Sequence, residues 1–259
     1  MGEQEDEFLD ELRATALKLH NNGELNFNGF SEKTLSHYRH LMDQGLSLEL
    51  YNNTKDIYFD FVKPDLFLFM EDLTKIISVH DNGFEKNAEK MIGHPCPHGN
   101  PKSFAWAAMT RVGNNRRNDL QFFVSIKADF LRVGLYTSKK NASQKFNSVV
   151  LHASQNVDGF IELVDEAAKE GYSLDTHRDD AHDDGSSIPL KLNRNLPHVS
   201  IGEHQHFHLV KPTSHDFVRN FTPLETIDKA LHGFAHTRRM YEFCMSKNQL
   251  PKKYRIFPK

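Results

Sequence analysis

The chain has 259 residues, of which 38% are hydrophobic and 26% are charged, and this composition excludes an intrinsically disordered chain. The formal net charge of −3 argues against a protein coated in basic surface for nucleic acid. The longest purely apolar run spans residues 66–70, far short of the roughly 20 residues that cross a bilayer, so no membrane-spanning segment is expected. The acidic start is unlike a secretion signal, and the only cysteines are Cys96 and Cys244, so we expect a cytoplasmic protein with two reduced thiols.

The first third of the chain, residues 1–92, is predicted to be helical. Apolar residues at helical spacing indicate a helix over residues 5–20. Ser31 is the predicted N-cap of a second helix, and a third helix is expected to start near Asn53. Pro64 is expected to disfavour helical geometry at the residue before it and to open a fourth helix.

The second part of the chain, residues 102–259, is predicted to combine strands with helices. Branched and aromatic residues over 120–137 predict two strands around a tight turn at 128–129. Residues 158–171 have the pattern of a helix that is capped by Asp158 and stopped by a glycine. Three further segments are predicted strands: residues 146–152, 188–194 and 206–211.

The last predicted element is a long helix with a clear start signal. Thr222 is suited to cap it, Pro223 fits its first turn, and Glu225 completes a capping box. The order of helices, antiparallel strands and a closing helix predicts an α+β fold, and we expect residues 1–259 to form a single domain.

The third predicted helix, the proline that follows it and the later segments carry a family resemblance. The pattern Asn-Asn, Lys-x-x-Tyr-x-x-x-Val and a proline resembles a widespread bacterial domain family of unknown function; it falls on Asn52, Asn53, Lys55, Tyr58, Val62 and Pro64. The order of the later elements is similar over roughly residues 28–245. This resemblance implies a fold but no mechanism. A weaker similarity, in residues 104–109 and 133–136, is to the modified-cytosine-recognition domain of restriction systems.

A row of histidines near residue 204 is the first candidate site. On a strand, alternate side chains share a face, so His204 and His206 are placed to bring two ring nitrogens to one zinc ion or another divalent metal. The acidic loop 177–184 would supply the third ligand, for which His182 is the candidate. In the alternative interpretation the strand is simply half-buried, with Phe207 and Leu209 facing the core and the histidines facing water.

Basic residues at the two ends of the predicted hairpin form the second candidate site. Arg116 and Arg117 precede the hairpin, and Lys139 and Lys140 follow it. Such a cluster can contact phosphates, although solvated turns have the same composition. His94, Cys96 and His98 have metal-ligand chemistry, but no second ligand pair is visible, and a rigid loop is favoured.

Two functional hypotheses follow from these sites. The leading one is a cytoplasmic binding module without a cofactor. The sequence does not name its partner; an anionic ligand or nucleic acid is the first to test, and no membrane is expected. The alternative is a metal-dependent hydrolase that uses the histidine row and the acidic loop. The sequence does not decide whether the protein is an enzyme, nor its oligomeric state.

Overall fold

The structure is a computed structural model that describes residues 3–114, 119–138, 149, 152–153, 155–175 and 206–245. Helices make up its N-terminal part, a five-stranded antiparallel sheet follows, and a long helix comes last among the described elements. The predicted α+β fold class is therefore confirmed.

Four helices form the first third of the chain: α1 (Glu3–Asn21), α2 (Glu32–Asp43), α3 (Leu48–Ile57) and α4 (Lys63–His80). The Ser31 hydroxyl caps α2 as predicted, because it accepts a hydrogen bond from the Thr34 backbone N–H at 3.2 Å. The third helix starts earlier than expected. The Ser47 hydroxyl accepts a hydrogen bond from the Leu50 N–H at 3.1 Å and caps α3. The helix therefore begins at Leu48, five positions before the predicted start near Asn53.

Pro64 does not disfavour helical geometry at Lys63, so that part of the prediction is wrong, but it does lie in the first turn of the fourth helix as predicted. Residues Tyr58–Val62 form a π-helical turn, η1, and Lys63 keeps α-helical backbone angles of φ −66° and ψ −45°. The wider π turn carries the chain from α3 into α4 and places the proline in the first turn of α4, where its missing N–H is not needed.

The sheet contains β1 (Ala105–Met109), β2 (Gln121–Ile126), β3 (Phe130–Ser138), β4 (Ser173–Asp175) and β5 (His206–Ser214). Its strand order is β1-β2-β3-β5-β4, and each neighbouring pair is antiparallel. The predicted hairpin is confirmed as β2 and β3, and the predicted strand at 206–211 lies within β5. The strands β1 and β4 were not expected from the sequence.

The prediction of a strand at residues 146–152 is wrong at Val149 and His152, the two residues of this range that the structure describes. Val149 and His152 are helical, as is Ala153 just beyond. Val149 and Ala153 are four positions apart and both fully buried, which is the spacing of one helix face. A short apolar run does not distinguish the 3.6-residue period of a helix from the two-residue period of a strand. The strand predicted at 188–194 lies outside the described residues.

Two later helices matter for the candidate site. Helix α7 (Val157–Lys169) is capped by Asn156, whose side-chain oxygen accepts the Gly159 N–H at 3.1 Å, and not by Asp158 as predicted. Helix α10 (Pro223–Met245) has the expected capping box: the Thr222 N–H donates to Glu225 at 2.7 Å, and the Glu225 N–H donates to the Thr222 hydroxyl at 3.2 Å. Three short helical segments complete the described elements: α5 (Ala88–Met91), the 3₁₀ turn η2 (Pro97–Gly99) and α9 (His215–Asn220).

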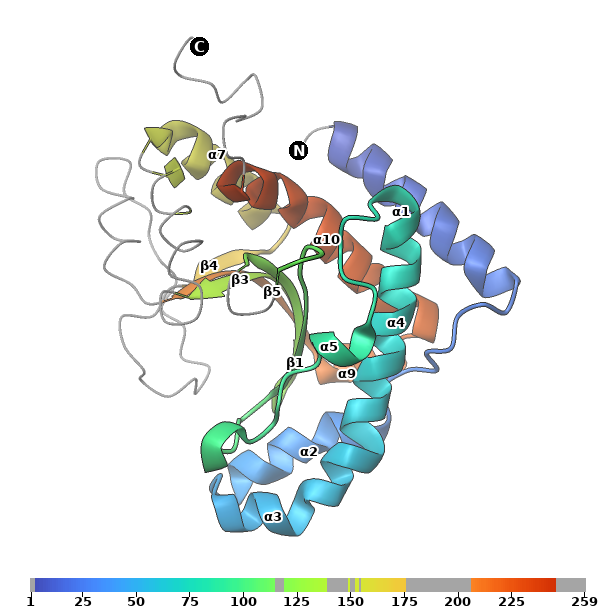
Figure 1. Ribbon diagram of the computed structural model, residues 1–259, viewed down its shortest axis with the longest axis vertical. Helices are drawn as coiled ribbons and strands as arrows, with labels where there is room; N and C mark the ends of the chain where they lie inside the picture. Colours follow the sequence, from blue (N-terminus) through green and yellow to red (C-terminus); the bar gives the residue numbers. More distant parts are fainter. Residues whose placement is uncertain are drawn as a thin grey trace.

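One apolar core joins the first helices to the sheet and to α10. Figure 1 shows α1, α4 and α10 on the same side of the sheet, with α2 and α3 at its lower end. Phe122 of β2 lies 4.5 Å from the ring of Phe234 and 4.9 Å from the ring of Tyr241, both in α10. These aromatic contacts fix α10 against the sheet. No described helix has the length and apolar character that crossing a membrane requires.

Candidate metal centre

Most of the predicted site residues lie outside the described part of the chain. This holds for Arg116, Arg117, Lys139, Lys140, His182 and His204. The backbone of His206 begins β5, but its side chain is not described. The hypotheses of a phosphate-binding patch and of a metal site in the histidine row therefore stay predictions.

Residues 207–209, the part of the histidine row whose side chains the structure describes, agree in part with the predicted half-buried strand. Phe207 and Leu209 are fully buried in the core, as the alternation predicts. His208, on the other face, does not simply point into water. It is half-buried, and its ring lies 4.6 Å from that of Tyr136 and 5.9 Å from that of Phe123. At this position an aromatic cluster occupies the second face of the sheet.

The segment around Cys96 is irregular apart from the 3₁₀ turn at Pro97–Gly99, in line with the predicted loop. The His94 Nδ1 atom accepts the Cys96 N–H at 3.0 Å, so one of its two nitrogens is used locally. Burial raises the pKa of the Cys96 thiol, which disfavours the thiolate that a metal would need. His94, Cys96 and His98 form no group of three metal-ligand atoms among the described residues.

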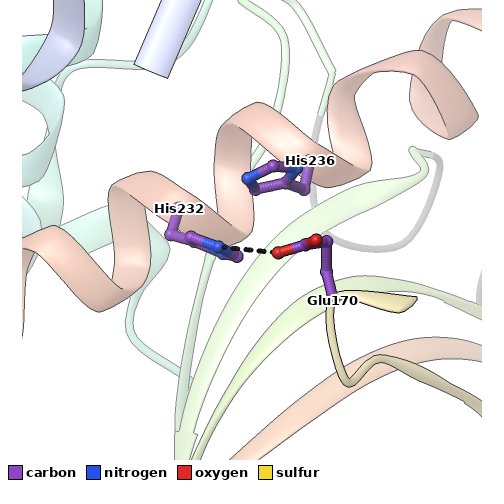
Figure 2. A group of neighbouring side chains, drawn as sticks. All are labelled: Glu170, His232 and His236. Carbon is purple, nitrogen blue, oxygen red and sulfur yellow. Dashed lines mark ion pairs between the residues drawn. The ribbon is translucent and has the colours of Figure 1, made fainter. Parts of the chain in front are cut away.

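A different set of residues forms a metal-ligand cluster. Glu170, His232 and His236 each offer one ligand atom, and these atoms lie within 4.8 Å of one another. The His232 Nε2 atom is 3.4 Å from the Glu170 carboxylate, and the ring centroids of the two histidines are 4.0 Å apart. Figure 2 shows both imidazoles on the side of α10 that faces Glu170, which lies just after α7.

Helix geometry brings the two histidines together. They occupy positions four apart in α10, so their side chains lie on one face, a turn from each other. Gly233, next to His232, lets this part of α10 approach the sheet. A Cβ atom there would lie 2.9 Å from Cγ2 of Val133 in β3.

The end of α7 positions the carboxylate. Glu170 is the C-cap of the helix, and Gly171 follows with a φ of 82°, the left-handed conformation that glycine adopts most readily. The chain turns there and enters β4, with Tyr172 pointing back to α10. The Tyr172 hydroxyl lies 3.4 Å from Nδ1 of His232, and the two rings are nearly parallel at 9°.

The surroundings keep the imidazoles neutral, which is the form that binds a metal. Burial lowers the pKa of His232 to about 3, with smaller contributions from the charges of His236 and Lys211. Burial also lowers the pKa of His236. If the Nδ1–H of His232 donates to the Tyr172 hydroxyl oxygen, Nε2, the atom nearer to Glu170, keeps its lone pair for a metal.

The separations suit a small divalent ion. With metal–ligand bonds of about 2.0–2.2 Å, neighbouring ligands in a tetrahedral site lie about 3.3–3.6 Å apart. The distance between His232 and Glu170, 3.4 Å, already falls in this range. The side chains of His232 and Glu170 are 19% and 25% exposed, so solvent reaches the cluster. Two nitrogens and one carboxylate are a ligand set for zinc or another transition metal, with further positions left for water or substrate.

A second polar link lies next to the cluster and holds the same helices. Arg239, on α10, donates to Glu166 of α7 at 2.6 Å, and its Nε atom lies 2.8 Å from Glu5 of α1. All three side chains are less than one fifth exposed. Arg239 therefore links α7, whose C-cap is Glu170, to α10, which carries His236.

One local sequence signal for this cluster lies in the last helix. Residues 232–236 read His-Gly-Phe-Ala-His, a pair of histidines at i and i+4 inside a strongly predicted helix. That spacing places both imidazoles on one face of the helix, as in helical metal sites with two histidine ligands. Nothing local in the sequence pairs it with Glu170.

The chain matches no protein-family model, and no curated protein is similar to it. The two family resemblances drawn from the sequence therefore stay predictions.

Proposed function

We propose that this protein binds a divalent metal ion through Glu170, His232 and His236. The observation that carries the proposal is the convergence of three ligand atoms, within 4.8 Å of one another, from two separate helices. The sequence-based hypothesis of a metal-dependent protein is kept in this proposal, with a different set of ligands.

The proposed chemistry is metal-assisted hydrolysis. Structural zinc sites have four protein ligands, whereas catalytic ones have three and keep a position for water. Two histidines and a glutamate form a set of the second kind. A zinc ion there would lower the pKa of its bound water and polarise a substrate oxygen. The partial exposure of the cluster supports this reading, because substrate and water need access.

The test is metal content in protein that carries no histidine tag. After dialysis against zinc and removal of free ion, we expect about one equivalent of zinc per chain. The variant His232→Ala/His236→Ala is expected to lose it. The control His20→Ala/His40→Ala removes two exposed histidines elsewhere and is expected to retain it.

A further variant separates this proposal from the histidine row. If His204→Ala/His206→Ala loses the zinc and His232→Ala/His236→Ala retains it, the ion belongs to the row and the present proposal is wrong. Clearly substoichiometric zinc in the unaltered protein also contradicts it. A thermal scan gives a second readout: at a free zinc concentration a hundredfold above Kd, binding adds about 2.7 kcal/mol to the stability of the fold.

A further inference from the structure

A lysine lies beside the proposed metal ligands. Lys211 is on β5, and its side chain extends over the turn that follows α7. Its Nζ atom is 5.6 Å from the centre of the Tyr172 ring, and 3.9 Å from where a Cβ atom on Gly171 would stand. The ammonium group is therefore next to the segment that carries Glu170.

The charge of Lys211 reaches all three proposed ligands. Burial lowers the pKa of His232 and of His236, and the charge of Lys211 acts in the same direction on both. Burial also lowers the pKa of Lys211, while the charge of Glu170 acts in the opposite direction. Lys211 forms no ion pair with any residue in the described ranges, although it is half-buried.

A metal ion at the cluster would place positive charge next to Lys211. A divalent ion held by one carboxylate and two neutral imidazoles has one net positive charge, and the ammonium of Lys211 adds another beside it. Of the other carboxylates that act on the histidines, Asp228 and Glu5 are each already paired with an arginine, and Asp6 is exposed. An oxyanion on the ion would give the half-buried ammonium a negative partner in addition to Glu170.

We propose that the metal site takes an oxyanionic ligand, of the carboxylate or phosphate type, with one oxygen on the ion and another on the ammonium of Lys211. This inference rests on the metal site of the proposed function and names the class of substrate that it accepts. Lysine binds such groups as a compact point charge.

The test uses protein loaded with Co²⁺, whose visible absorption reports changes in its ligands. Addition of inorganic phosphate, and separately of acetate, is expected to change the spectrum in a saturable way, and the stronger response identifies which oxyanion is preferred. In Lys211→Met the affinity for the preferred anion is expected to fall at least tenfold, while the affinity for Co²⁺ stays within about threefold.

The matched control is Lys18→Met. Lys18 is an exposed lysine of α1, twelve positions from Asp6 and hence about 18 Å along the helix from the end near His236. It is expected to bind the anion as the unaltered protein does. Lys211→Arg keeps the charge and is expected to recover part of the affinity.

The outcomes separate the two proposals. If Co²⁺ does not bind to the unaltered protein, the metal site and this inference both fail. If Co²⁺ binds but neither anion changes the spectrum, or if Lys211→Met binds the anion as tightly as the control, only the inference fails. Retained Co²⁺ binding in Lys211→Met shows that a lost anion response does not come from unfolding.

Discussion

The Nε2 atom of His232 lies 3.4 Å from the carboxylate of Glu170, and this contact joins the middle of α10 to the end of α7. The same two helices are joined again by Arg239 and Glu166 at 2.6 Å. These two polar contacts connect α10 to the C-terminal end of α7. The contact between Arg239 and Glu166 therefore joins the two helices through residues other than the proposed ligands.

Glu170→Gln is expected to weaken metal binding while leaving the fold intact. The amide keeps the size of the side chain but removes the negative charge that attracts a cation. Replacing even a hydrogen-bond partner of a metal ligand costs about 10–100-fold in affinity, and loss of a ligand is expected to cost at least as much. Titration with zinc, followed by calorimetry, measures the change.

The matched control for this change is Asp165→Asn, because Asp165 is an exposed carboxylate on the same helix. It is expected to bind zinc as the unaltered protein does. Equal zinc affinity for Glu170→Gln and the unaltered protein would show that the carboxylate is not a ligand.

Gly233→Ala is expected to destabilise the protein, although alanine is the better helix former. The added Cβ would press on Val133 Cγ2 at 2.9 Å and lie 3.4 Å from the Tyr172 hydroxyl. Overpacking of this kind costs about 1–3 kcal/mol in the free energy of unfolding, more than the roughly 1 kcal/mol that alanine gains in a helix. Urea unfolding measures the difference.

Val133→Ala provides the matched background for Gly233→Ala, because it removes the methyl groups that the new Cβ meets. In that background we expect Gly233→Ala to be neutral or stabilising. The two changes should thus couple by about 1–3 kcal/mol in a double-mutant cycle. Simple additivity would mean that contact with Val133 does not set the position of α10.

His37 is expected to make the protein less stable in mild acid. It is only 2% exposed, and neither ring nitrogen has a hydrogen-bond partner among the residues that the structure describes. Burial, with a smaller contribution from His40, lowers its pKa from 6.5 to about 4. Between these values the unfolded chain takes up a proton that the folded chain does not, so stability falls as the pH falls through this range.

The size of this effect follows from the two pKa values. Lowering the pH from about 7 to about 5 should cost about 2 kcal/mol through His37 alone. In His37→Leu the loss of stability over that interval, measured by urea unfolding with a chelator present, is expected to shrink by that amount. His20→Leu, at an exposed histidine, should leave it unchanged. An unchanged loss in His37→Leu would exclude His37 as its source.

Thr222→Ala is expected to lower the free energy of unfolding by about 1 kcal/mol. The Thr222 hydroxyl accepts the N–H of Glu225 at 3.2 Å, and this N–H has no other partner within the helix. Thr222→Ser keeps the oxygen and is expected to retain most of the stability. Chemical denaturation of both variants gives the comparison, and similar losses in the two would point to packing of the threonine methyl instead of the cap.

Local patterns predicted much of the fold. The caps at Ser31 and Thr222, the hairpin of β2 and β3, and the alternation around Phe207 depend on neighbours in the chain, and the structure confirms them. The errors occur where local signals are ambiguous. A short apolar run near Val149 suits a strand or a helix, and Pro64 is compatible with a helix once a π turn precedes it.

The sequence by itself predicted an α+β fold and a long last helix, because both depend on periodicity along the chain. The same periodicity places His232 and His236 on one face of that helix, a pair recognised only once the cluster was seen. Only the tertiary structure decided that Glu170 and Lys211 lie next to those histidines. The two come from the end of α7 and from β5, and they meet α10 because core packing brings these elements together. A site made of residues distant in sequence is fixed by packing, and no local pattern encodes it.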